Sequence, residues 1–79
     1  MEEKLLDILE KICEDDIVRS EPDLDMYEEG LLDSLATAEL LIALEEGFGV
    51  VISPTEYEKD DLSTVNKIKK ILKDKGVAE

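Results

Sequence analysis

The sequence contains no histidine and no tryptophan, and Cys13 is the only cysteine among its 79 residues. Histidine is the side chain that most often acts as a general base near neutral pH. The sequence also shows no Gly-rich phosphate loop, no metal-ligand spacing and no Gly-x-Ser-x-Gly motif. A single cysteine cannot form an internal disulfide, which fits a reducing compartment. We therefore expect a protein that is not an enzyme and holds no metal, with Cys13 buried on a helix and chemically unused.

Basic residues are also scarce, since 9 Lys and Arg stand against 22 Asp and Glu, for a net charge of −13. Nucleic acids and anionic lipids are bound through Lys and Arg, so the sequence predicts neither kind of partner. No apolar run is long enough to cross a bilayer, and the opening Met1-Glu2-Glu3 lacks the basic and apolar regions of a signal peptide. We expect a cytoplasmic protein, one domain over residues 1–79, that meets basic patches on its partners.

Apolar residues at helical spacing near the N-terminus predict a first helix of three to four turns. Its inward-facing residues are Leu5, Ile8, Leu9, Ile12 and Cys13. From about residue 15 to 33 the periodicity fails, and Pro22 and Gly30 interrupt the chain. The scattered apolar side chains of this segment favour an ordered loop held against the core, because a disordered linker would leave them in water.

A second helix is predicted from the residues that follow this loop. Asp33 and Ser34 stand where an N-cap is expected, directly before a periodic run from Leu35 to Phe48. Ser34 would then lie at the exposed start of the helix, where free backbone N–H groups and the helix dipole favour a phosphate ester on its hydroxyl. Serine in this place is usually only a cap, so the local pattern leaves both interpretations open.

Apolar side chains lie on two faces of this second helix when its residues are placed at ~100° intervals. The predicted core face consists of Thr37, Leu40, Leu41, Leu44 and Phe48. The opposite face carries Leu35, Glu39, Ile42 and Glu46. Single exposed apolar residues are ordinary. Here they align with the serine and are rimmed by carboxylates, which predicts a docking surface for basic, apolar partners.

The C-terminal part of the chain predicts two further helices. Gly47 and Gly49 should end the second helix in the left-handed conformation of a C-cap. Residues 50–52 should form a buried extended connector, and residues 53–56 a short helix start with Ser53 as cap and Pro54 at the first helical position, continuing to about residue 59 or 60.

The last helix is predicted to begin at a cap, either Ser63 or Thr64. Its inward residues are Val65, Ile68, Ile71 and Leu72. Lysines gather toward its C-terminal end, where they suit the negative end of the helix dipole. The fold class predicted is therefore all-α, a small four-helix bundle with three longer helices and one short helix.

The chain resembles the acyl carrier protein superfamily over nearly its whole length. The resemblance is carried by Asp33-Ser34-Leu35, by Ala38-Glu39-Leu40 and by the stretch 44–49, Leu-Glu-Glu-Gly-Phe-Gly. It implies an acyl-carrier bundle in which a separate phosphopantetheinyl transferase attaches 4′-phosphopantetheine from coenzyme A to Ser34, with Asp33 beside it. It also implies an acyl or aminoacyl thioester on the arm, and a partner-docking helix that includes Leu35, Glu39, Ile42 and Glu46.

Within the superfamily, residues 13–18, 22–34 and 52–57 are most similar to the D-alanyl carrier branch. That similarity implies a monomer loaded by an ATP-dependent D-alanine ligase, from which a membrane acyltransferase system moves D-alanine toward lipoteichoic acid. The chain departs from the branch at Leu62 and Val65, where Trp and Pro are common, and at Leu35, where Phe or Met often occurs. Ala36 departs from the acidic residue usual in fatty-acid carriers.

Two alternatives stay open from the sequence. One is a fatty-acyl or peptidyl carrier, which would use the same serine for another cargo. The other is an unmodified acidic adaptor, in which Ser34 only caps the helix and the strip around Leu35 and Ile42 binds a partner noncovalently.

Overall fold

The first helix forms where the apolar spacing predicts it. The computed structural model describes residues 2–53 and 55–77, and helix α1 spans Glu2–Cys13. Acidic residues fill its first turn and Lys11 lies in its last, so both ends suit the helix dipole. Leu5 and Leu9 are fully buried on its inner face.

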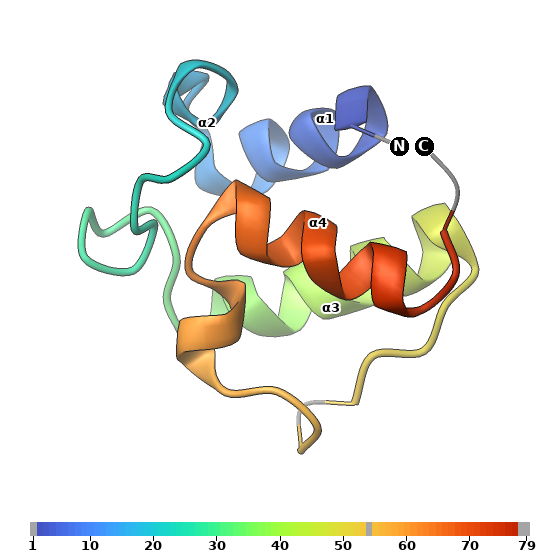
Figure 1. Cartoon of the computed structure of the whole chain (residues 1–79). Helices are drawn as coiled ribbons and strands as arrows, with labels where there is room; N and C mark the ends of the chain where they lie inside the picture. The colour runs from blue at the N-terminus through green and yellow to red at the C-terminus, as the bar shows by residue number, and fades with distance from the viewer. Residues whose placement is uncertain (1, 54, 78–79) are drawn as a thin grey trace.

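Four further helical elements follow in the described part of the chain. They are α2 (Ile17–Ser20), α3 (Ser34–Phe48), the 3₁₀ helix η1 (Lys59–Leu62) and α4 (Val65–Asp74). Helices α3 and α4 run in the same general direction, and α1 runs the opposite way (Figure 1). The all-α class and the bundle of three longer helices are confirmed.

One core joins these helices. It contains leucines of α1 and α3, the inner face of α4 and single residues from the loops between them, including Met26, Leu32 and Ile52. The four inward residues predicted for α4 are all buried. Thr64 is the cap of that helix, because its side chain accepts a hydrogen bond from the Lys67 amide at 3.1 Å.

The segment between α1 and α3 is ordered, as predicted, but it also contains the four-residue helix α2, which the sequence did not predict. Arg19 of α2 binds three carboxylates of α1: Glu10 at 2.6 Å, Glu3 at 3.4 Å, and Asp7. Farther along, Met26 is fully buried, and its carbonyl accepts from two later backbone amides. These contacts hold the loop against the core just before α3 begins.

The short helix predicted from Ser53 is wrong. Residues 55–57 form a turn instead, and the helical turn η1 begins at Lys59. Ser53 Oγ accepts from the Thr55 amide at 3.3 Å, whereas the Glu56 carboxylate pairs with Lys75 at 2.9 Å. The Glu56 side chain is thus held by the C-cap residue of α4 and does not cap a helix that starts at Ser53. The predicted place of Pro54 lies outside the described residues.

Two smaller predictions near the end of α3 also need correction. Gly47 is helical, and only Gly49, with φ of 68°, adopts the left-handed C-cap. A Cβ at position 47 would lie 3.2 Å from Ile8 Cδ1, so the glycine permits close packing of α1 on α3. In the connector, Ile52 is buried as expected, but Val51 is 73 % exposed.

Candidate functional site

At the start of α3 the helix cap is Asp33, and the Ser34 hydroxyl has no part in capping. Asp33 is the N-cap, and its Oδ1 accepts from the Ala36 amide at 2.8 Å. Ser34 is the first helical residue and is exposed. Among residues 2–53 and 55–77 its hydroxyl has no hydrogen-bond partner. Ser34 is therefore not the N-cap of α3, and the interpretation of this serine as only a helix cap is wrong.

A chain of hydrogen bonds fixes this helix start to the preceding loop. The Thr37 hydroxyl donates to the Asp33 carbonyl at 2.7 Å. Because its proton is used there, the Tyr27 hydroxyl is the donor in the 2.6 Å hydrogen bond with Thr37 Oγ1. Tyr27 is in turn held by its own amide, which donates to Asp25 Oδ1 at 3.0 Å. The loop thus fixes the backbone that carries Ser34.

Two grooves open directly beside Ser34. The first, about 240 Å³, lies between α3 and η1. Its lining residues are Ser34, Thr37, Leu41, Tyr57, Lys59 and Leu62. The second, about 350 Å³, lies between α3 and the connector that contains Ile52, and Ser34, Ala38 and Ile42 also border it. A group attached to Ser34 would therefore meet an apolar surface on either side of the helix start.

The outer face of α3 is exposed as the sequence predicts. Leu35 is 72 % exposed and Ile42 is 56 % exposed, and Glu39 and Glu46 are exposed beside them. Neither carboxylate forms an ion pair with a residue that the structure describes. The four predicted docking residues therefore form one continuous strip on α3 that begins next to Ser34; we call it the outer strip.

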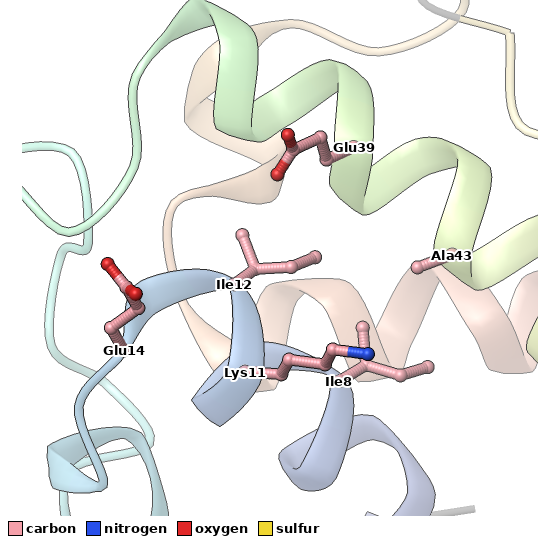
Figure 2. A pocket seen from close by; sticks show the side chains of 6 residues that line it. All are labelled: Ile8, Lys11, Ile12, Glu14, Glu39 and Ala43. Carbon is pink, nitrogen blue, oxygen red and sulfur yellow. The ribbon is translucent and has the colours of Figure 1, made fainter.

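A third and larger cavity, about 520 Å³, opens between α1 and α3. Figure 2 shows Ile8 and Ile12 of α1 facing Glu39 and Ala43 of α3 across it. Ser34 does not line this cavity, and its walls carry no serine, cysteine or histidine. Glu39 is the one residue of the outer strip that lines this cavity. Of these three cavities, Ser34 lines only the two smaller grooves described above.

The described residues give no sign of a reactive cysteine, a metal site or a membrane span. Cys13 is half-buried, and burial, followed by the charge of Asp15, raises the pKa of its thiol, which disfavours the reactive thiolate. No cluster of His, Cys, Asp or Glu within residues 2–53 and 55–77 could hold a metal ion. Across the same ranges, none of the helices has both the length and the apolar character that a membrane span needs.

Sequence reasoning missed two features of this site. One is the hydrogen-bond chain from Tyr27 to Asp33, because Thr37 was assigned to the core face by its spacing. The other is Lys59, which the sequence placed only at the end of a short helix. No local motif reveals either feature, since both depend on contacts between segments far apart in the chain.

Comparison with known proteins shows which family the chain matches. Residues 3–72 match the family described as "Phosphopantetheine attachment site". A protein of Bacillus subtilis named D-alanyl carrier protein is 46% identical over 84% of this chain and 85% of its own length. Proteins of the same name from Bacillus velezensis and Abiotrophia defectiva are 44% and 40% identical, over 84% and 99% of this chain and 85% and 99% of their own lengths.

Proposed function

Because the chain belongs to the phosphopantetheine attachment-site family, we propose that it carries D-alanine as a thioester on a 4′-phosphopantetheine group attached to Ser34. This prosthetic group supplies a flexible arm that ends in a thiol. The protein contributes the attachment hydroxyl, a rigid helix start and a surface for partners. It is a carrier and not a catalyst.

The single observation that carries the assignment of Ser34 is its exposed hydroxyl without a hydrogen-bond partner among the described residues. Attachment would therefore break no hydrogen bond of the described chain. The first turn of α3 favours a phosphodiester there, because its unpaired N–H groups and the dipole offset negative charge. Asp33 keeps the turn formed through its bond to Ala36 and leaves the serine free. The residues present thus fit the group.

D-alanine as the cargo is supported by the relatives, which are named D-alanyl carrier proteins and are matched over most of both chains. On this proposal an ATP-dependent ligase loads the thiol with D-alanine, and a membrane acyltransferase system moves it toward lipoteichoic acid. Coenzyme A and ATP are cytoplasmic compounds, which supports a cytoplasmic place for attachment and loading.

The outer strip is the proposed contact surface for these enzymes. Leu35 and Ile42 offer apolar area next to the attachment point. Glu39 and Glu46, which have no ion-pair partner among the described residues, offer negative charge that attracts a basic partner. We place these contacts on a monomer with one carrier domain over residues 1–79. The shared strip would let one small protein meet several enzymes in turn.

Intact-mass measurement tests the attachment. The protein is incubated with coenzyme A, Mg²⁺ and a permissive phosphopantetheinyl transferase, and we expect the gain of one phosphopantetheinyl group. Ser34→Ala should gain nothing. Ser20→Ala is the matched control, because Ser20 is also exposed but its hydroxyl donates to the Ile17 carbonyl, and it should be modified like the wild type. Modification of Ser34→Ala, or none of the wild type by an active transferase, would refute the proposal.

A further inference from the structure

Lys59 is the cation that shares a groove with Ser34. Both residues line the 240 Å³ groove between α3 and η1, and no other Lys or Arg does. The Lys59 ammonium lies 5.1 Å from the centre of the Tyr27 ring. That ring belongs to the tyrosine whose hydroxyl bonds to Thr37, one turn beyond Ser34. The position of Lys59 is thus tied to the same hydrogen-bond chain that fixes the start of α3.

The carboxylates nearest Lys59 on its own element are already engaged. Asp60 pairs with Lys67 at 3.2 Å, and Asp61 accepts from the Glu58 amide at 3.0 Å. Lys59 makes no ion pair with any described residue, although acidic residues outnumber basic ones 22 to 9. Asp25 is close enough to line a neighbouring hollow with Lys59, but its Oδ1 accepts from the Tyr27 and Glu28 amides. Lys59 therefore has its charge available.

We propose that Lys59 binds the phosphodiester that joins the prosthetic group to Ser34, an inference that rests on the proposed function. Attachment adds a negative charge to a protein whose net charge is already −13. A lysine from η1 on the opposite wall of the groove offsets that charge. It also ties the base of the arm to η1, so that the arm starts along the Leu41 and Leu62 side of α3.

Lys59→Met tests the contact, because it removes the charge and keeps most of the length of the side chain. Lys4→Met is a closely matched control: Lys4 is also exposed and lies 5.4 Å from the centre of an aromatic ring, Phe48. Phe48 is the last residue of α3, so Lys4 is at the far end of the helix from Ser34. Lys59→Arg keeps the charge and should behave like the wild type.

The readouts are the ³¹P resonance of the phosphodiester and the midpoint of thermal unfolding, Tm, with and without the prosthetic group. We expect Lys59→Met to shift the ³¹P resonance and Lys4→Met to leave it in place. Lys59→Met should lower Tm more in the modified form than in the unmodified form, by about 1–5 °C, the range for one exposed ion pair in a small domain. Lys4→Met should lower Tm equally in both forms.

Equal loss of Tm in both forms of Lys59→Met, with an unchanged ³¹P resonance, would overturn the contact and leave attachment at Ser34 intact. A mass spectrum of each sample keeps the two proposals apart. If the wild type gains no phosphopantetheinyl group from an active transferase, the proposed function fails, and the role of Lys59 fails with it.

Discussion

The two faces of α3 carry similar side chains in opposite environments. On the inner face Leu40 and Leu44 are 0 % exposed, whereas on the outer strip Leu35 is 72 % and Ile42 is 56 % exposed. Burial of a leucine or isoleucine contributes about 1.5–3 kcal/mol, so the outer strip forgoes stabilisation that the inner face obtains. Hydrophobicity alone therefore does not decide which face of α3 packs against the core, and Leu35 and Ile42 leave apolar area exposed on its outer face.

The carboxylates of α1 and those of the outer strip differ in whether they form ion pairs. Arg19 of α2 binds three carboxylates of α1, and Glu2 of α1 pairs with Lys69 of α4. Glu39 and Glu46 of the outer strip have no such partner in the described part of the chain. The paired carboxylates of α1 thus connect helices, whereas Glu39 and Glu46 connect no two elements among the described residues.

The greatest difference in stability is expected between Leu44 of the inner face and Ile42 of the outer strip. Leu44→Ala should lower the free energy of unfolding by about 2–5 kcal/mol, because it leaves a cavity in the core. Ile42→Ala should change it by less than about 0.5 kcal/mol, as for other exposed positions. Urea unfolding of both variants gives the two values. Similar losses would show that the outer strip is part of the packed fold.

Charge reversal on the outer strip is the next largest effect. Glu39→Lys combined with Glu46→Lys should slow association with the D-alanine ligase by about tenfold at low salt and weaken its salt dependence, because steering by opposite charge is lost. Stopped-flow measurement gives the rate. A variant with the same charge change elsewhere, Glu21→Lys with Asp74→Lys, should retain most of the rate. A rate unaffected by reversal on the strip would refute its docking role.

A smaller effect separates Asp33 from Ser34. Asp33→Ala should lower the free energy of unfolding by about 1 kcal/mol, because it removes the cap of α3. Ser34→Ala should change it by less than about 0.5 kcal/mol, since no described hydrogen bond is lost. Thermal and urea unfolding of the unmodified proteins compare them. A larger loss for Ser34→Ala would show that the serine has a structural role.

The smallest effect concerns the paired carboxylates in acid. Hydrogen bonds from Lys69 and Lys75 hold the pKa values of Glu2 and Glu56 below their ordinary value. A lowered folded-state pKa means that each pair stabilises the fold above the unfolded-state pKa and that this stabilisation is lost as the pH falls through the lower folded-state value. Glu56→Gln and Lys75→Gln should therefore each flatten the fall in Tm below pH 4.5. An unchanged acid limb in both variants would contradict the pairing.

The sequence predicts the elements whose signals are local. The three longer helices follow from apolar periodicity, and the exposure of Leu35 and Ile42 follows from their place opposite the core residues of α3. Asp33 and Ser34 were correctly placed at a helix start, although spacing alone could not decide which of them is the cap. That choice depends on the extended backbone of Asp33, which aims its carboxylate at the Ala36 amide.

Features set by distant contacts escaped prediction. Helix α2 has only four residues, too few for periodicity, and Arg19 ties it to α1. The helix expected from Ser53 does not form, and Glu56 instead pairs with Lys75, the C-cap residue of α4. The place of Lys59 opposite Ser34 depends in turn on where η1 begins. All three features depend on contacts between segments that are distant in the sequence.

Loading of the modified protein with D-alanine tests whether it is a D-alanyl carrier. The protein bearing phosphopantetheine is incubated with a D-alanine-activating ligase, ATP and D-alanine, and in parallel with a fatty-acid-activating enzyme and a fatty acid. We expect the gain of one D-alanyl group, which hydroxylamine should cleave from the arm because it is held as a thioester, and no gain in Ser34→Ala. Preferential loading with the fatty acid, or D-alanine bound to Ser34→Ala, would show that the protein is not a D-alanyl carrier.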